Sequence, residues 1–328
     1  MKRMRGCVGL LVATLAAVGC APGSSVGESR EALRLTTTVT WRLPWGDGPA
    51  AVGLRPEGPD FLAEGPSAVA VGPDGAAWVL DRLNRRVLRL EPEKGRVEVA
   101  AAVPEDAEDL TVGADGTLAV YSPLSARVLV GVVGAPREVA VPRSLSEIRG
   151  VLLASGRRVL VQTAHQERYF VGTPAAPQTL ATMLHSRRAG EFEIEDGRGV
   201  AVRRLQGGVA ELLLRRPGER LAAAAGFVLP ERVLAARVVG TAGLTACLRL
   251  EIEQPGPGVS VRRTVVCHDM TTGARRFARD LAAPGRYLPR REIAVGGVPA
   301  RLALLHAGVE GLEVALVPLG APAKGAAP

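Results

Sequence analysis

Aromatic residues and lysines are scarce in this chain. Phenylalanine, tryptophan and tyrosine make up 3% of its 328 residues, and lysine occurs only at positions 2, 94 and 324. No block of basic residues is interleaved with aromatics, which argues against a nucleic-acid partner. The positive charge comes from arginines scattered over predicted strands and turns, a pattern typical of a solvated surface.

The sequence also lacks the common motifs of catalytic and metal sites. It contains no Gly-x-Ser-x-Gly, Gly-x-x-x-x-Gly-Lys, His-Glu-x-x-His or Cys-x-x-Cys, and no calcium loop with acidic residues at alternating positions. The four histidines fall in different local contexts, at positions 165, 185, 268 and 306. We therefore predict no catalytic set, no metal and no cofactor.

The first nineteen residues have the layout of a secretory signal. Basic residues at positions 2, 3 and 5 precede an apolar run from Val8 to Val18, which is too short to span a bilayer. Ala17-Val18-Gly19-Cys20 resembles a bacterial lipobox, in which the cysteine is lipidated and becomes the first mature residue. Ala17 stands where leucine is usual. The alternative is an ordinary signal peptide cleaved near Ala21.

A lipid on Cys20 would attach the mature chain to a membrane. Residues 20–32 are small and polar, which suits a flexible tether. Because Ala21 is not aspartate, the lipobox resemblance implies the outer membrane, facing the periplasm or the cell surface. We assign residues 1–19 to the signal peptide, 33–319 to the folded domain and 320–328 to a disordered tail.

Two cysteines remain in the folded part, Cys247 and Cys267, on either side of a Pro-Gly-Pro-Gly break. The flanking segments read as two strands. A hairpin centred on Pro257 places the two cysteines opposite each other and sets Glu251 against Arg263. In an oxidising compartment this register predicts a disulfide. A one-residue slip would instead leave two unpaired thiols on opposite faces.

Turn glycines recur at a fixed interval. Gly75, Gly116, Gly156 and Gly197 are separated by 41, 40 and 41 residues. A period near 40 built from short alternating strands is typical of a β-propeller blade. Since Pro73-Asp74-Gly75 lacks neighbouring oxygen ligands, we interpret it as a tight turn rather than a metal loop.

Each repeat divides into four strands, A to D. In the first repeat these are Ala68 to Val71, Ala76 to Leu80, Arg86 to Leu90 and Val97 to Ala101. Six such blades fit the chain, but the last lacks its D strand. The fold class is therefore all-β: a six-bladed propeller of about 41-residue blades, which Thr37 to Leu43 closes by pairing with the last blade.

The segment VAVGPDGAAWVLDRLNRRVLRLE resembles an NHL-type repeat. The matching positions are Val69 and Val71, Pro73 to Gly75, Asp81, Asn84, and Arg86-Val87. The resemblance is specific over the first blade and fair over the second. It implies a propeller from a group that includes binding modules for proteins and RNA and a few lactonases and lyases, so the fold alone does not select a function.

Candidate site residues follow from the expected blade geometry, in which D-to-A and B-to-C loops share one face. The equivalent B-strand positions are Asp81, Ser122, Gln162, Arg203 and His306. The D-to-A loops add Glu108, Asp109, Glu147, Glu191 and Glu292. These acids either form a polar pocket or are merely solvated. Asp81 and Asn84 are expected to cap the B-to-C loop by bonding backbone amides, with Arg86 as a partner of Asp81.

Two functions remain open. The first is a noncatalytic, monomeric envelope lipoprotein that binds a protein or an envelope polymer through one face. The second is a lactonase- or lyase-type enzyme with an axial metal site. The first is favoured because only Asp81 and His306 in the ring of equivalent positions could bind a metal.

Overall fold

The computed structural model describes residues 37–319, except 132, 133, 135, 146, 155, 156, 190, 191, 194–197, 257, 259 and 284. The expected signal peptide, the tether with Cys20 and the C-terminal tail lie outside the described residues, as do Gly156, Gly197 and Glu191. Within the described part, no helix is both long and apolar enough to cross a bilayer.

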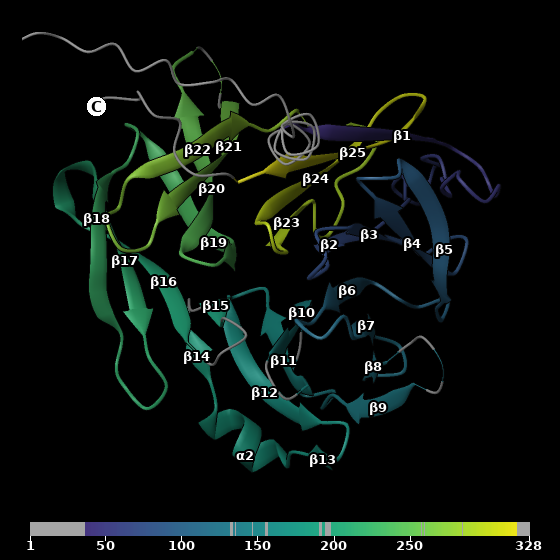
Figure 1. The fold of residues 1–328 in the computed structure, drawn as a ribbon, viewed down its shortest axis with the longest axis horizontal. Coiled ribbons are helices and arrows are strands. Elements are labelled where there is room, and N and C mark those ends of the chain that lie inside the picture. Colours follow the sequence, from purple (N-terminus) through teal and green to yellow (C-terminus); the bar gives the residue numbers. More distant parts are fainter. Residues whose placement is uncertain are drawn as a thin grey trace, which may run out of the picture.

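Six antiparallel sheets are arranged around a central axis, which confirms the predicted propeller (Figure 1). Blade 1 contains β2 (Ala68–Val71), β3 (Ala77–Asp81), β4 (Arg86–Glu91) and β5 (Arg96–Ala102). Blade 2 contains β6 (Asp109–Val112), β7 (Leu118–Ser122), β8 (Arg127–Val130) and β9 (Arg137–Ala140). Blade 3 contains β10 (Ile148–Ala154), β11 (Arg158–Thr163), β12 (Glu167–Thr173) and β13 (Ala176–Pro177), with β14 (Arg188–Ala189) also paired to β12.

The second half of the ring is built in the same way. Blade 4 contains β15 (Phe192–Glu193), β16 (Gly199–Arg204), β17 (Val209–Arg215) and β18 (Ala222–Val228). Blade 5 contains β19 (Val233–Ala242), β20 (Thr245–Gln254), β21 (Ser260–Asp269) and β22 (Arg275–Asp280). Blade 6 contains β23 (Ile293–Gly296), β24 (Arg301–Ala307), β25 (Gly311–Pro318) and β1 (Val39–Pro44). Within residues 37–319, the described helices are short, namely α2 (Leu180–His185) and η2 (Gln206–Gly208).

The ring is closed by its N-terminal strand, as the sequence predicts. Strand β1 pairs antiparallel with β25, with Val39 opposite Leu316 and Pro44 opposite Gly311. Figure 1 shows β1 in purple beside the yellow strands of blade 6. This pairing covers the edge that β25 would otherwise expose.

Blades pack face to face, so their inner strands are buried on both sides. Every residue of β2 and β3 is buried, although the two strands are only four and five residues long. Between blades 6 and 1, one apolar cluster joins Val69 and Leu88 to Ala303 and Val314. Because both faces are covered, β2 and nearly all of β3 are apolar rather than alternating.

The A-to-B turns of the first two blades have the same geometry. In blade 1 the amide of Ala76 donates to Asp74 Oδ1 at 3.1 Å, and Gly75 has a φ of 75°. In blade 2 the amide of Thr117 donates to Asp115 Oδ1 at 2.9 Å, and Gly116 has a φ of 77°. Only glycine adopts this conformation without strain, which confirms the tight-turn interpretation.

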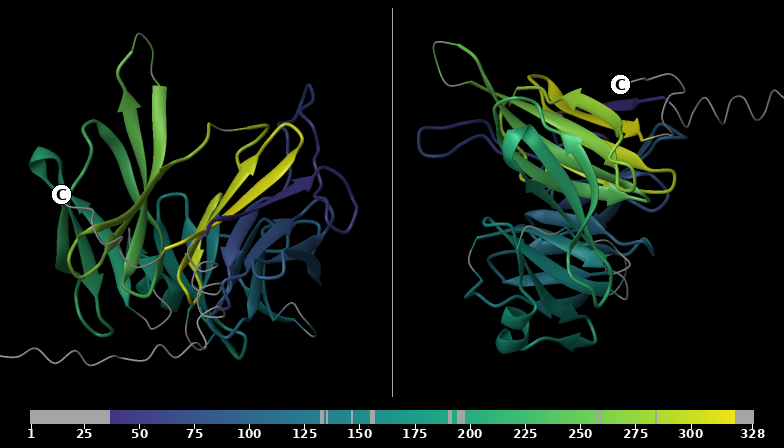
Figure 2. Two further views of the ribbon diagram at one scale, coloured as in Figure 1. Left: turned by 45° about the horizontal axis from the view of Figure 1, so that its top comes forward. Right: turned by 90° about the vertical axis from the view of Figure 1, so that its left-hand side faces the viewer.

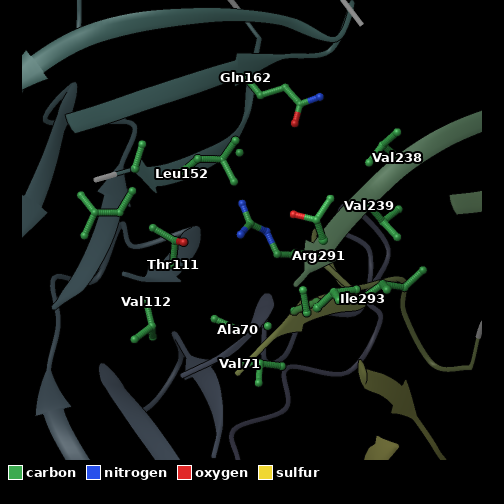
Figure 3. A pocket seen from close by; sticks show the side chains of 18 of the residues that line it. Ala70, Val71, Thr111, Val112, Leu152, Gln162, Val238, Val239, Arg291 and Ile293 are labelled. Atoms are coloured by element: carbon green, nitrogen blue, oxygen red, sulfur yellow. The ribbon is translucent and has the colours of Figure 1, made fainter. Parts of the chain in front are cut away.

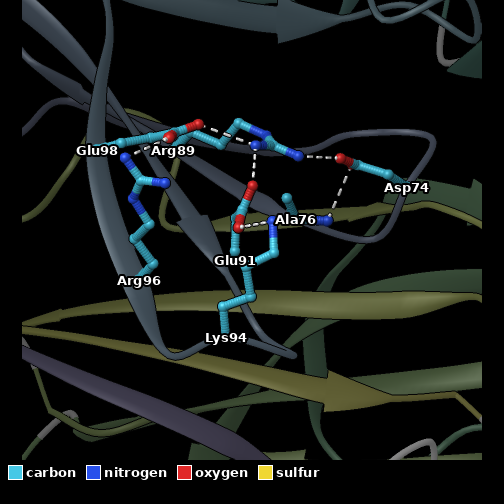
Figure 4. Close-up of polar contacts among 7 residues, drawn as sticks. All are labelled: Asp74, Ala76, Arg89, Glu91, Lys94, Arg96 and Glu98. Carbon is cyan, nitrogen blue, oxygen red and sulfur yellow. Dashed lines mark hydrogen bonds and ion pairs between the residues drawn. The ribbon is translucent and has the colours of Figure 1, made fainter.

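Several arginines on the blade surfaces form ion pairs and are not merely solvated. Figure 4 shows Arg89 between Asp74, Glu91 and Glu98, with Nη2 at 2.5 Å from Asp74 Oδ2 and Nη1 at 2.9 Å from Glu98 Oε1. The hydrogen bond to Asp74 raises the pKa of Arg89 above its usual value. Lys94 adds a contact of 2.9 Å to Glu91. The network joins the A-to-B and C-to-D turns of blade 1.

The predicted disulfide between Cys247 and Cys267 is present, and the two residues lie directly opposite each other in β20 and β21. Glu251 lies opposite Arg263 as predicted. Glu251 and Arg263 do not form an ion pair with each other, however. Glu251 pairs with Arg249, and Arg263 pairs with Glu292, which lies in the loop before β23 of blade 6. The two ten-residue strands project beyond the neighbouring blades (Figure 2).

The strand directions define two faces of the ring. We call the side with the D-to-A and B-to-C connections the loop face, and the side with the A-to-B and C-to-D turns the turn face. The connection 45–67 lies on the loop face, where Trp45 donates to Val309 O and Tyr287 donates to Pro66 O. Strand β1 begins on the turn face, beside the end of β25.

Candidate functional site

A cavity of about 480 Å³ occupies the centre of the ring. The innermost strands of five blades line it, namely β2, β6, β10, β19 and β23. Figure 3 shows the apolar part of its wall, which includes Val71, Val112, Leu152, Val238 and Ile293. The inner strands supply these small and aliphatic side chains, and they also place polar side chains such as Thr111 and Arg237 in the lining.

Arg291 extends into this cavity from the loop that precedes β23 (Figure 3). Its Nη2 donates to Asp109 Oδ2 at 2.5 Å and to the carbonyl of Val151 at 2.8 Å. Its Nη1 donates to the carbonyl of Leu110 at 3.1 Å. One side chain from blade 6 therefore reaches across the ring to blades 2 and 3.

Arg290 makes a parallel set of contacts. It forms an ion pair with Glu108 and donates to the carbonyls of Ile148 and Arg149, the latter from Nε at 3.2 Å. Burial, together with the neighbouring charge of Arg291, lowers the pKa of Arg290 to about 10. We call Arg290 and Arg291 the arginine bridge, because together they fasten blade 6 to blades 2 and 3 at the loop-face end of the cavity.

Gly150 makes room for the arginine bridge. A Cβ at this position would lie 3.1 Å from Nη2 of Arg291, closer than nearly all natural contacts. The ladder between β10 and β11 is also irregular between Ile148 and Gly150. The start of β10 is thus shaped to receive the guanidinium group.

Asp109 is the buried carboxylate of the arginine bridge. It is fully inaccessible to solvent, and its Oδ2 also accepts a hydrogen bond of 2.6 Å from the amide of Val151. Burial raises the pKa of Asp109 to about 6, although Arg291 and the amide act in the opposite direction. The positive charge of Arg291 therefore offsets the cost of burying the ionised Asp109 carboxylate.

The other D-to-A acids that the structure describes do not form an open acidic pocket. Glu292 is paired with Arg263 at 2.7 Å and with Arg249 at 3.3 Å. Glu147 is exposed at the start of β10. The structure thus brings Glu108, Asp109 and Glu292 to the arginine bridge and its neighbourhood, but each has an arginine partner.

The sequence interpretation missed those arginine partners. Their signal was the run Arg290-Arg291-Glu292 immediately before the last predicted A strand.

Asp81 lies outside the axial cavity and holds the loop-face connection 45–67. Its Oδ1 accepts from the amide of Gly53 at 2.9 Å, and its Oδ2 accepts from Asn84 at 2.8 Å and from Arg86 at 3.0 Å. The expected partnership with Arg86 is present, but the amide is not in the B-to-C loop. The closing strand β1 brings Gly53 over blade 1, and the sequence pattern gave no sign of this contact.

The equivalent B-strand positions do not form one site. Gln162 lines the axial cavity, whereas Ser122 is fully buried and Arg203 is paired with Glu211 at 2.5 Å. His306 is half-buried beside a separate cavity of about 90 Å³ that Tyr287 also lines. Among the residues that the structure describes, no three His, Cys, Asp or Glu side chains are grouped so that they could hold a metal ion.

Exposed apolar side chains are concentrated on the loop face. On this face they include Leu62 at 79%, Leu124 at 77% and Val309 at 72%. Others in the loop-face connections or at adjoining strand ends are Phe61, Leu205, Val209, Val228, Leu234 and Leu288. In the part of the chain that the structure describes, the A-to-B and C-to-D turns expose only Leu244 and Val298 among the large hydrophobic residues.

No protein-family model matches the chain, and no curated protein is similar to it in sequence. Solved structures share its fold. A chain of a mitotic checkpoint complex is 11% identical, with a TM-score of 0.50 and coverage of 94% of this chain and 100% of that one. A streptogramin B lyase is 10% identical, with a TM-score of 0.46 and coverage of 85% and 97%.

A calcium-binding regucalcin from Agrobacterium tumefaciens is 12% identical, with a TM-score of 0.42 and coverage of 86% and 96%. These neighbours include both enzymes and binding proteins. At such low identities the likeness concerns the fold alone.

Proposed function

We propose that this protein is a noncatalytic, envelope-anchored propeller that binds a protein through its loop face. The observation that carries the proposal is the concentration of exposed apolar side chains on that face, including Leu62, Leu124 and Val309. Exposed apolar surface, where it forms a contiguous patch, marks protein interaction sites. An envelope polymer is the alternative partner.

The charged groups of the loop face support a binding role. Asp81 holds the connection 45–67, and Asp109 and Glu292 are engaged by arginines. A general acid or base needs a carboxylate that can reach the substrate. These three carboxylates instead stabilise the ring and its loop face.

The position of β1 supports an orientation in which the loop face points away from the membrane. Because β1 begins on the turn face, a chain attached to Val39 approaches the propeller from that side. A lipid on Cys20 would therefore place the membrane behind the turn face and direct the loop face outward. The intervening chain can extend to on the order of 60 Å, enough for a monomeric propeller to reach a partner in the surrounding compartment.

The binding proposal is tested by cross-linking and capture from envelope fractions. Leu62, Leu124 and Val309 are changed together to aspartate, and the matched control changes Leu244 and Val298 on the turn face. We expect loss of the same cross-linked protein in the loop-face variant only. Equal loss or equal retention in both variants contradicts the proposal, and capture of a polysaccharide alone supports the alternative partner.

The anchor is tested separately with Cys20→Ala. We expect the unchanged protein to incorporate labelled palmitate and to sediment with membranes, and the variant to do neither. Membrane association that persists in the variant contradicts the lipid anchor and leaves the loop-face proposal intact.

A further inference from the structure

The axial cavity carries an excess of positive charge. Five arginines contribute to its lining, and Glu292 is the single acidic residue among its described lining residues; the arginines are Arg149, Arg237, Arg249, Arg290 and Arg291. Three of the five have carboxylate partners. A cleft lined by one sign of charge with apolar walls concentrates ligands of the opposite charge.

Arg149 and Arg237 differ from the other three arginines. Among the described residues, neither guanidinium group has a hydrogen-bond or ion-pair partner, and both side chains are exposed. Arg149 lies in the second position of β10, and Arg237 lies on β19 opposite Arg249, which contacts Glu292. Both therefore lie near the loop-face end of the cavity, close to the arginine bridge.

Two neutral polar groups accompany these arginines. The amide of Gln162 extends toward the centre of the cavity (Figure 3). Thr163 also lines the cavity and is buried, and its hydroxyl has no hydrogen-bond partner within the described part of the chain. A buried hydroxyl without a partner is uncommon in native proteins and is satisfied when a ligand supplies an acceptor.

Most of the other lining residues are aliphatic, alanine or glycine, and the cavity leads to the opposite side of the ring. Pro73, Ala114, Gly243 and Val298, which belong to A-to-B turns, continue the lining to the turn face. The arginine bridge crosses the loop-face end, so a long polymer could not thread through the axis. The cavity is therefore suited to a small molecule that approaches from the turn face.

We propose that the axial cavity binds a small amphipathic organic anion. Its anionic group contacts Arg149 and Arg237 beneath the arginine bridge, with Gln162 and Thr163 completing the polar contacts. Its apolar body packs against Val71 and the other aliphatic side chains toward the turn face. The cavity volume of 480 Å³ lies in the range of small-molecule sites, which is roughly 300 to 1,000 Å³.

The test uses calorimetry on the full mature chain with Cys20→Ala, which avoids detergent. The probes share one ring system and differ in charge: 2-naphthoate, 2-naphthylmethanol and 2-naphthylmethylammonium. Decanoate serves as a second anion of different shape. We expect saturable binding of at least one carboxylate at one site, with much weaker binding of the alcohol and the ammonium compound.

Arg149→Gln and Arg237→Gln should each weaken carboxylate binding about tenfold, as loss of a charge-assisted hydrogen bond does. Val238→Trp, which fills the cavity, should abolish binding. Arg216→Gln, on an exposed turn away from the axis, should leave the affinity unchanged and serves as the matched control.

Three results would overturn the proposal: binding of neither carboxylate, equal binding of the alcohol, or unchanged affinity in both cavity arginine variants. Binding that survives Val238→Trp would place the probe on the exposed apolar surface and would also overturn it. Melting curves confirm that each variant is folded, and Val238→Trp provides a charge-independent test if an arginine variant does not fold. The capture experiment for the loop face is unaffected by any of these outcomes.

Discussion

Replacing Arg291 by methionine tests whether the arginine bridge fastens the ring. The substitution removes three hydrogen bonds and leaves the Asp109 carboxylate buried without its cation. Breaking a buried ion pair by removing one partner costs about 3 to 5 kcal/mol. We therefore expect Arg291→Met to lower the free energy of unfolding by about that amount at pH 8.

The loss should depend on pH in a defined direction. Burial raises the pKa of Asp109 to about 6, and removing Arg291 raises it further. A carboxyl whose pKa is raised in the folded state stabilises the fold when protonated, and this contribution is lost as the pH rises through the folded pKa. At pH 5 Asp109 is protonated in the variant, so only the lost hydrogen bonds to Leu110 and Val151 remain, on the order of 1 kcal/mol each.

Urea unfolding followed by circular dichroism at pH 5 and pH 8 measures both losses. Arg203→Met is the matched control, because Arg203 pairs with Glu211 on the surface; its removal should cost less than about 1 kcal/mol at either pH. The double variant Asp109→Asn, Arg291→Met should recover part of the stability at pH 8 and lose the pH dependence. A loss that is equal at both pH values would refute the assignment of Asp109 as the buried, Arg291-dependent charge.

Three further predictions concern the rest of the ring. Deleting residues 33–45 removes β1 and should abolish the cooperative melting transition; a native melting profile would show that β1 does not close the ring. Changing Cys247 and Cys267 to alanine should cost about 3 kcal/mol in urea unfolding, and recovery of both alkylated cysteines from the unreduced parent protein would contradict the disulfide. Hydrogen bonds from Arg276 and from backbone amides lower the pKa of Asp269, so Asp269→Asn should destabilise the protein most at neutral pH. The difference from the parent should shrink progressively as the pH falls below the unfolded pKa of about 4 toward the much lower folded pKa; a difference as large at pH 2 as at pH 7 would contradict the ion pair.

Much of the fold could be predicted because each repeat carries its turn and strand signals within a short stretch of sequence. The Asp-Gly turns at Gly75 and Gly116 have the same hydrogen bonds and positive φ values, so their spacing reports a repeated structure. The register of the hairpin followed from the cysteines and the break between them. By contrast, the repeat did not predict α2. The repeat calls for a full D strand in blade 3, but this strand has only two residues, and a helix capped by Thr179 follows it.

The candidate site was harder to predict because its contacts join distant segments. The sequence indicated which acids lie at strand starts, including Asp109 and Glu292. It gave no indication that Arg291 would cross the axis to residues about 180 positions away, or that Gly53 would reach Asp81. Such contacts depend on which blades face each other across the closed ring, and the repeat pattern in the sequence does not contain this information.

The pairing of β1 with β25 also sets the order in which the protein can fold. Val39 is among the earliest residues of the described chain to be synthesised and its partner Leu316 is among the last. Such a distant pairing makes folding slow, because the loop must close before the contact stabilises it. An exported chain would therefore cross the membrane with blade 6 incomplete. We expect its open sheet edge to need protection by a chaperone until the C-terminal strands emerge.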